Sequence, residues 1–177
     1  MRFGARLIAA LFLLLSGCSF FSRAKNDVYT IDVVPGTASK AGGTPIGIGA
    51  LELPPGIDRR EIVVRKAGQQ LDVRGNELWP ATFSQLVLHT LAFDLAARLP
   101  AGMMVLPGES KPAAMRSIDI AFQEIAAGPE PKVTIDAQWE SHREHIEVPI
   151  TSLDSANVAE GISKGLGELA DRIAAAF

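Results

Sequence analysis

The residue with the most distinctive chemistry is Cys18, which carries the only thiol in this chain of 177 residues. Two small residues, Ser16 and Gly17, stand directly before it, and small side chains fit the narrow cleft of a peptidase. A thiol is a nucleophile to which a diacylglycerol group can be transferred. A lone cysteine cannot form a disulfide within the chain. The pattern therefore predicts acylation of Cys18.

The residues before Cys18 have the organisation of a secretory signal. Arg2 and Arg6 give a positively charged start, with no acidic residue before Asp27, and residues 7–15 (LIAALFLLL) form an unbroken apolar run of nine residues. A helix that spans a bilayer needs about 20 apolar residues, so this run is too short to span. We interpret residues 1–17 as a signal peptide.

Residues 15–18 (LSGC) resemble the lipobox of bacterial lipoproteins. The resemblance implies that the chain is cut before Cys18 and that this cysteine becomes the acylated N-terminus, carrying lipid of the palmitate type. The alternative is an ordinary secretory signal with an incidental cysteine. Ser19 follows, where enterobacterial lipoproteins retained in the inner membrane commonly have aspartate, so by analogy serine favours the outer membrane. Residues 18–26 then form a lipidated tether.

Three histidines could in principle ligate a metal. His142 and His145 fall in a predicted polar turn, where a solvated pair is the simpler interpretation, and His89 lies beside the apolar stripe of a predicted helix. No further cysteine is present to complete a site with them. We predict no metal site and no cofactor.

Some glycines, carboxylates and serines could suggest phosphate binding or catalysis, but their patterns are weak evidence for either. The glycines at 42–43 and 47–49 resemble a phosphate-binding loop only superficially, because the residues that follow cannot begin a helix; a glycine-tolerant strand or bulge fits better. Asp119 and Asp136 fall on the polar faces of adjacent predicted strands. The serines lack a Gly-x-Ser-x-Gly elbow. The sequence therefore predicts a protein that is not an enzyme, with no catalytic residues.

Alternating apolar and polar residues predict most of the structural elements. The segments that read as strands are residues 29–34, 46–53, 62–65, 103–106, 117–125, 132–139 and 146–150, with a short edge strand at 71–73. Apolar residues at helical spacing predict helices over 81–99 and from Asp154 or Ser155 to Phe177. Three glycines in the second helix suggest close approach to a sheet. The prediction is a single two-layer α+β domain, with a mostly antiparallel sheet packed against two amphipathic helices.

Composition limits the partners of this domain. Without the signal peptide, 160 residues remain with a formal charge of −5, which disfavours nucleic acid as a partner and leaves no basic patch for anionic headgroups. The tether of residues 19–26 reaches roughly 30 Å when fully extended. A domain of this size has a radius of gyration of roughly 15 Å. The domain at 27–177 must therefore stay near one membrane.

Several segments, in order, resemble the PqiC-like (YmbA-like) ABC-type transport auxiliary lipoproteins. They are residues 46–55 (IGIGALELPP), residues 57–65 (IDRREIVVR), Trp79 and the helix end at 95–99 (LAARL). The chain departs from the family pattern at Gly56-Ile57, where an aromatic–aliphatic pair is usual, and after Trp79.

The resemblance implies a periplasmic, non-enzymatic component of an envelope lipid-transport system that supports membrane integrity. Its implied partners are an MCE-domain protein and a transporter permease, and a homo-oligomer is compatible with it. From the residues themselves we expect the partner to contact the turn and strand at 54–65, through Pro54, Pro55, Asp58, Arg59 and Arg65. Local pairing of Asp58 with Arg59, which would only shape the turn, is an equal alternative. The alternative function is a structural or envelope-assembly lipoprotein of the outer membrane that binds peptidoglycan or an outer-membrane protein.

Overall fold

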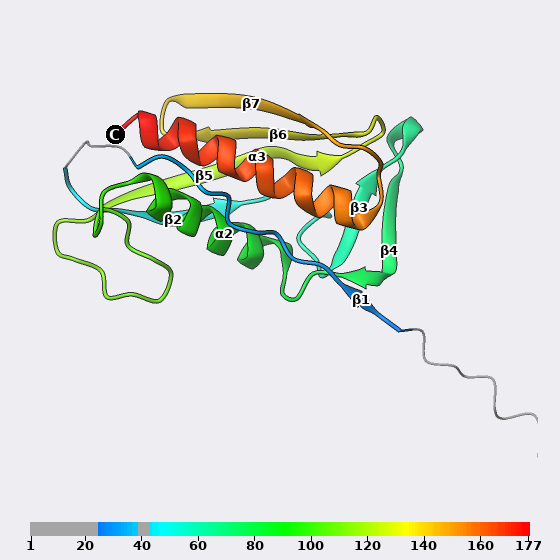
Figure 1. The fold of residues 1–177 in the computed structure, drawn as a ribbon, viewed down its shortest axis with the longest axis horizontal. Coiled ribbons are helices and arrows are strands. Elements are labelled where there is room, and N and C mark those ends of the chain that lie inside the picture. Colours follow the sequence, from blue (N-terminus) through cyan, green and yellow to red (C-terminus); the bar gives the residue numbers. More distant parts are fainter. Residues whose placement is uncertain (1–24, 39–42) are drawn as a thin grey trace, which may run out of the picture.

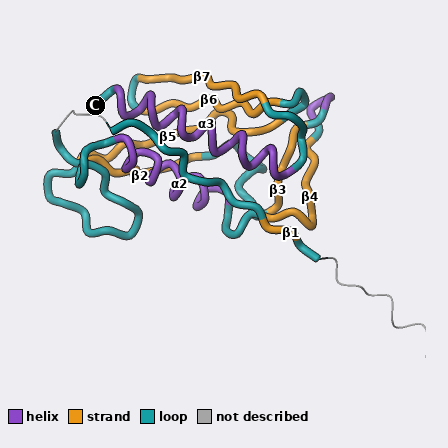
Figure 2. Tube along the Cα trace, in the orientation of Figure 1, coloured by secondary structure: helices purple, strands orange, loops and turns teal. Residues whose placement is uncertain are grey.

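The computed structural model describes residues 25–38 and 43–177, so the predicted signal peptide and Cys18 lie outside the described residues. Within the described part, one sheet of seven strands carries two long helices on one face (Figures 1 and 2). The elements in chain order are β1 (Asp27–Val28), β2 (Ile46–Glu52), β3 (Glu61–Arg65), the 3-10 turn η1 (Ala67–Gln69), β4 (Leu71–Leu78), α2 (Phe83–Arg98), β5 (Arg116–Ala127), β6 (Lys132–Trp139), β7 (His142–Pro149) and α3 (Ser155–Ala175).

The sheet is mixed in direction. Its order is β1-β4-β3-β5-β6-β7, and β2 pairs with β5 beside this path. The pairs β3–β4, β5–β6 and β6–β7 are antiparallel, whereas β1–β4, β2–β5 and β3–β5 are parallel. The predicted α+β fold, with one sheet and one helical layer in a single domain, is confirmed.

Strand β5 is the centre of the sheet and has two neighbours along the same edge. β2 pairs with its first half, whereas β3 meets it only at the register pair Val64–Ala127. Near the second contact, the buried rings of Trp79 and Phe83 stack with centroids 5.4 Å apart and line a small space together with Ile125 and Ala126 of β5. The connection from β4 to α2 therefore packs beside the second half of β5.

Alternation along the strands separates a buried face from a polar face, as predicted. Ile118 and Ile120 of β5 and every second residue of β6 from Val133 to Trp139 are buried under the helices. The glycines of α3 allow that helix to lie close to the sheet, because a Cβ on Gly161 would stand 2.7 Å from Cγ2 of Val133. Asp154 caps α3 by accepting a hydrogen bond from the amide of Asn157, as the sequence suggested.

The strand predicted at residues 29–34 is wrong. Only Asp27 and Val28 pair with the sheet, and residues 29–36, which we call the strap, cross the groove between α2 and α3 without strand pairing (Figure 1). Helix side chains replace the ladder: the amide of Asp32 donates to Oγ of Ser163 at 3.0 Å, and the amide of Val34 donates to Oδ1 of Asp94 at 2.7 Å. The apolar alternation arose because the strap buries Ile31 between two helices.

Other differences follow from how far the sheet extends. The predicted strand at 103–106 is a loop with one isolated bridge, between Met104 and Ile46. β4 is much longer than the predicted edge strand at 71–73, because β3 pairs along it as a hairpin. His142 and His145 belong to β7 rather than to a turn, because β6 and β7 pair without interruption up to Trp139–His142.

Candidate functional site

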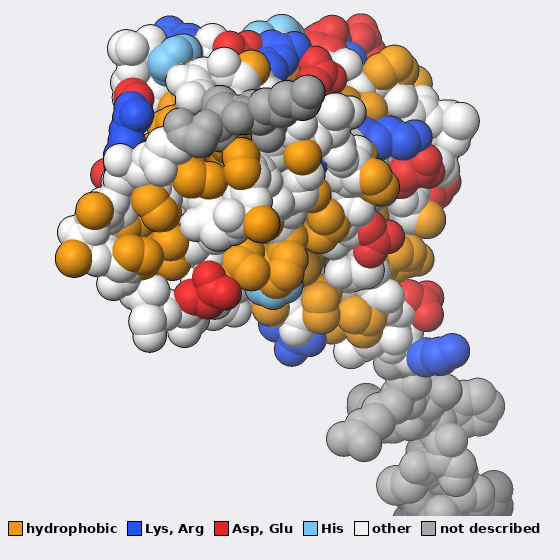
Figure 3. Space-filling view, turned by 60° about the vertical axis from the view of Figure 1, so that its left-hand side comes forward, with side chains coloured by type: hydrophobic (Ala, Val, Ile, Leu, Met, Phe, Trp, Pro, Cys, Tyr) orange, Lys and Arg blue, Asp and Glu red, His pale blue; other side chains and the backbone are white. Residues whose placement is uncertain are grey.

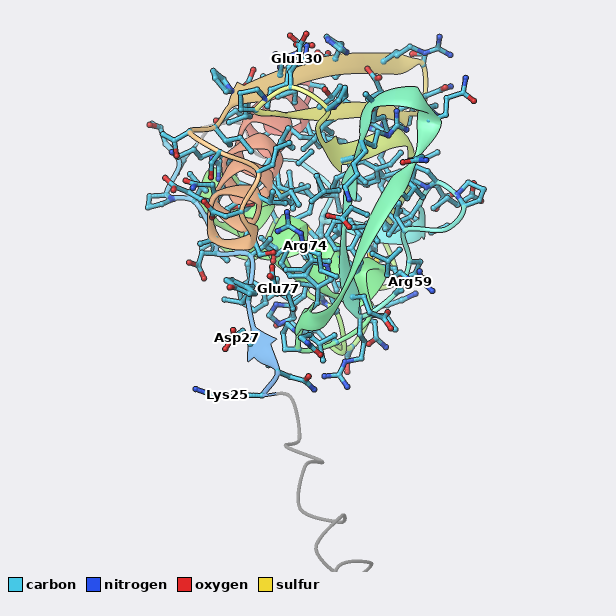
Figure 4. All side chains as sticks on the ribbon, turned by 90° about the vertical axis from the view of Figure 1, so that its right-hand side faces the viewer. Lys25, Asp27, Arg59, Arg74, Glu77 and Glu130 are labelled. Atoms are coloured by element: carbon cyan, nitrogen blue, oxygen red, sulfur yellow. The ribbon has the colours of Figure 1, made fainter. Side chains whose placement is uncertain are left out.

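The described chain begins at one end of the domain. β1 pairs with the last residues of β4, Asp27 with Glu77 and Val28 with Leu78, and the amide of Tyr29 donates to the Leu78 carbonyl at 2.9 Å. Figure 4 shows Lys25 and Asp27 on the opposite side of the molecule from Glu130. Any attachment through the N-terminal segment therefore meets the domain at this end.

The turn of residues 54–60, which we call the 54–60 turn, lies at the same end. Glu61, directly after it, pairs with Leu78, the β4 residue that also pairs with β1. The backbone of Arg60 accepts a hydrogen bond from the amide of Trp79 at 2.6 Å, and its guanidinium donates back to the Trp79 carbonyl at 3.3 Å. The turn is thus fixed between the sheet and the start of α2.

Asp58 has a local role that the sequence did not reveal. Its carboxylate accepts a hydrogen bond of 2.9 Å from the amide of Ser84, in the first turn of α2. Thr82, the residue at the N-cap position, makes no capping bond through its own side chain. Asp58 therefore caps α2 from outside the helix, where a negative charge is favoured.

The remaining predicted contact residues divide into two groups. Pro54 is partly buried and Pro55 is exposed in the turn, and Arg59, with 43 % of its side chain exposed, has one ion pair, to Glu61 at 3.5 Å. Arg65 lies at the other end of β3 and pairs with Glu124 at 3.2 Å on the polar face of the sheet. Pro54, Pro55, Asp58 and Arg59 therefore form one cluster, from which Arg65 is separate.

An ionic cluster, buried except for Asp171, holds the strap against both helices, and it was not predicted from the sequence. Arg98, 2 % exposed, donates to the carbonyl of Val34 at 2.9 Å and to Asp171 of α3 at 2.6 Å. Asp94, 0 % exposed, accepts from the amide of Val34 and lies 3.6 Å from Arg98. We call Asp94, Arg98, Asp171 and Val34 the clasp.

The charge state of the clasp depends on burial. Burial raises the pKa of the Asp94 carboxyl to about 6; the Val34 amide and Arg98 act in the opposite direction, and the negative charge of Asp171 adds to the rise. The second oxygen, Oδ2, is buried without a hydrogen-bond partner among the described residues. The signal in the sequence was a charged pair at i,i+4 inside the apolar stripe of α2, which predicts a buried pair rather than a solvated one.

The outer face of the sheet carries exposed ion pairs. The hydrogen bond from His145 to Asp136, 2.6 Å long, raises the pKa of the imidazole, and the bond between Lys132 and Glu147, also 2.6 Å, lowers the pKa of that glutamate. Within residues 25–38 and 43–177, no group of three or more histidine, cysteine, aspartate or glutamate side chains is placed to hold a metal ion. His145 therefore belongs to a solvated network on the exposed sheet face, whereas the ring of His142 stacks on Trp139 with centroids 5.2 Å apart and His89 lies on α2.

The glycine-rich stretch lies in β2, where the register with β5 shifts between Ile48 and Leu51. Asp119 stabilises this irregularity by accepting a hydrogen bond of 2.7 Å from the amide of Ala50. A Cβ on Gly49 would collide with Asp119 and Ser117. The predicted glycine-tolerant bulge is confirmed.

These features define a class: a small α+β domain in which a capped turn lies beside the first described residues and a strap is held between two helices. None of the helices in the described part is long and apolar enough to cross a membrane. The chain belongs to the ABC-type transport auxiliary lipoprotein component family, whose model matches residues 29–174.

Two solved structures share the fold. One, titled as an uncharacterized protein, is 14 % identical with a TM-score of 0.69, covering 86 % of this chain and 98 % of its own. The other, a Xanthomonas campestris protein of the DUF330 family, is 16 % identical with a TM-score of 0.62, covering 82 % of this chain and 91 % of its own. No curated protein matches the sequence.

Proposed function

We propose that this protein is the auxiliary lipoprotein of an MCE-type, ABC-dependent system that moves lipid between the two membranes of the envelope, and that it supports membrane integrity by docking a transport partner. It is anchored through Cys18, on the periplasmic side of the outer membrane. The observation that carries the proposal is the family match, which extends over nearly the whole folded domain. The family name supplies transport and lipidation; the lipid cargo and the partner are our inference.

The dimensions of the chain support a docking role rather than a bridging one. Six residues lie between Cys18 and Lys25, the first described residue, and the seven Cα–Cα steps across them reach at most about 25 Å. A domain with a radius of gyration of roughly 15 Å cannot by itself connect two membranes. An elongated partner must span the remaining distance, and the lipoprotein receives one end of it.

The 54–60 turn is the surface we assign to that contact. It is held rigidly by the hydrogen bonds of Arg60 with Trp79 and of Asp58 with Ser84, so little conformational entropy is lost when a partner binds. Arg59 and Pro55 are left exposed on it. A rigid turn that presents a cation suits an acidic or carbonyl-rich surface on the partner.

The test is site-specific photo-crosslinking in cells that make the full-length protein. A crosslinking residue at Pro55 should capture an MCE-domain protein or a transport permease, whereas the same residue at Glu130, on the opposite side of the molecule, should not (Figure 4). The variant Arg59→Glu should reduce the yield at Pro55, and Arg143→Glu on the outer sheet face should leave it unchanged. Capture of an outer-membrane protein or of peptidoglycan, or of the chain itself alone, would overturn the docking proposal.

A further inference from the structure

The exposed side of α2 has an unusual composition for a surface helix. Its only two residues with full charges, Asp94 and Arg98, are both buried. The residues that reach solvent are all uncharged or histidine, and we call them the α2 face: Ser84, Gln85, Leu86, Leu88, His89, Phe93, Ala96 and Ala97. A helix on a protein surface normally carries its charges on the outside.

The neighbouring helix provides the comparison. α3 also exposes eight residues, and five of them are charged: Glu160, Lys164, Glu168, Asp171 and Arg172. The two helices lie side by side in the same layer of the same domain (Figure 1). The exposed side of α3 is rich in charged residues that favour contact with water, whereas the exposed side of α2 has none. We therefore expect the α2 face to contact something other than water.

An apolar hollow continues the α2 face. A cavity of about 200 Å³ lies beside Leu88 and is lined by Ile48, Met104, Leu106 and Met115, with Lys111 also on its wall. Figure 3 shows hydrophobic side chains gathered on the lower half of the face it displays, while most charged side chains lie nearer its top and right-hand margin. The apolar surface therefore extends from the helix onto the loop that follows it, where the acidic side chain of Glu109 and the basic side chain of Lys111 also line the hollow.

We propose that the α2 face and this hollow rest on the lipid surface of the membrane that carries the anchor. The inference rests on the proposed function, because it takes Cys18 as the lipid attachment. The short N-terminal segment carries the argument: the seven Cα–Cα steps from Cys18 to Lys25 reach at most about 25 Å, about the length of the 16-residue helix α2 itself. The domain therefore cannot move far from the headgroups.

The place where the chain leaves the domain selects this face. β1 ends at Val28 beside Leu78, and Trp79 leads from there directly into α2. α2 lies below α3 in Figure 1, and Lys25 is on that same lower side in Figure 4, opposite Glu130. A pull towards the membrane at Lys25 thus turns the α2 face towards the lipid.

The chemistry of the surface favours lipid over a protein partner. Protein interfaces use a polar rim and about one hydrogen bond per 100–200 Å². The α2 face offers only Ser84, Gln85 and His89 as polar side chains. Glu109 and Lys111 on the wall of the hollow offset each other's charge, so apolar contact rather than headgroup charge would hold the surface on the membrane. Because the anchor keeps the local lipid concentration high, a weak contact is sufficient.

The test uses the full-length lipidated protein in vesicles of phosphatidylethanolamine and phosphatidylglycerol. With Cys18 acylated, a single introduced cysteine is the only free thiol. An environment-sensitive fluorophore at Ala97→Cys should shift its emission to the blue, be quenched by spin labels on the acyl chains and lose quenching by aqueous iodide. The matched label at Ala175→Cys, an exposed alanine of α3, should remain open to iodide.

Each outcome decides the matter. Equal iodide quenching at Ala97→Cys and Ala175→Cys on vesicles overturns the inference. Protection of the Ala97 label that depends on protein density without lipid, or that needs an added protein partner, also overturns it, in favour of a second copy or a protein. Vesicle flotation separates the lipid contact of the α2 face from the lipid anchor at Cys18. If the protein floats with the vesicles while its Ala97 label stays in water, only the lipid contact is overturned. If the protein does not float, the anchor is overturned as well.

Discussion

Replacing Asp94 by asparagine should change how the stability of this domain depends on pH. Asp94 is fully buried in the clasp, and burial raises the pKa of its carboxyl to about 6. Asparagine keeps an oxygen that can accept from the amide of Val34, and it cannot titrate. The substitution therefore removes one ionisation from the folded state while keeping the contact with the strap.

The sign of the effect follows from the direction of the shift. Because the folded pKa lies above the ordinary value of 3.8, the folded state keeps a proton that the unfolded chain releases between these two pH values. The contribution of Asp94 to stability is fully present below about pH 4 and is lost as pH rises through about 6. A shift of about two units corresponds to roughly 3 kcal/mol at about 1.4 kcal/mol per unit.

The assay is urea unfolding of the native chain and the Asp94→Asn variant at a series of pH values. Subtracting the two free energies of unfolding cancels the titration of every group that they share. The difference, native minus variant, should fall by about 2 kcal/mol between about pH 4.5 and pH 7, with no change in the m-value.

A difference that stays constant over this range would refute the reasoning, because Asp94 would then ionise alike in both states. Asp154 provides a control of opposite sign. Hydrogen bonds from Ser152 first, and then from Asn157, lower the pKa of its carboxyl to about 2. The stability that it contributes is present above about pH 4 and is lost as pH falls towards 2, so native minus Asp154→Asn should fall on acidification.

Two further predictions concern packing and capping. Gly161→Ala should destabilise the domain by about 1–3 kcal/mol although alanine favours helices, because its Cβ would stand 2.6 Å from Ile150 and 2.7 Å from Val133; thermal unfolding measures this, and a higher melting temperature would contradict it. Asp58→Ala should cost about 1 kcal/mol by removing the cap on Ser84, and Asp58→Asn should recover most of it in urea unfolding. Equal losses for both Asp58 variants would argue against a capping role.

The spacing of apolar residues and the flanking cap or turn residues were sufficient to predict the elements whose structure depends mainly on nearby sequence. β6 was predicted with its observed bounds, because Lys132 to Trp139 alternates without a break and turns flank it. α3 was predicted from its cap at Asp154 and from a stripe that repeats every three to four residues. In both elements, the period of the apolar residues matches the type of element, and those residues form the single face that packs against the rest of the domain.

The strap failed because alternation has more than one physical cause. Residues 29–34 alternate because Ile31 inserts between two helices while its neighbours face outwards, and a half-buried strand gives the same pattern. The distinguishing information lay in Asp94 and Arg98, far along the chain, which bind the backbone of Val34. The alternation within a short segment cannot reveal a contact with residues so far away in the sequence.

For the candidate contact residues, too, nearby sequence predicted some features, whereas others depend on tertiary contacts. Pro54, Pro55 and Arg59 could be placed together because they are neighbours in one turn. That Asp58 caps α2 depends on bringing Ser84 within 2.9 Å, and that Arg65 faces Glu124 depends on the register of β3 against β5. These tertiary facts decide which of the charges remain free for a partner.

The clasp explains why a domain would keep a carboxyl whose burial is unfavourable at neutral pH. A pull on the N-terminal segment first meets β1, which pairs with β4 at only two positions, Asp27 and Val28. Beyond them the strap is held by Ser163, Asp94 and Arg98, and Arg98 also binds Asp171, so the load passes to both helices. The desolvation of Asp94 is therefore the energetic cost of fastening the strap to both helices.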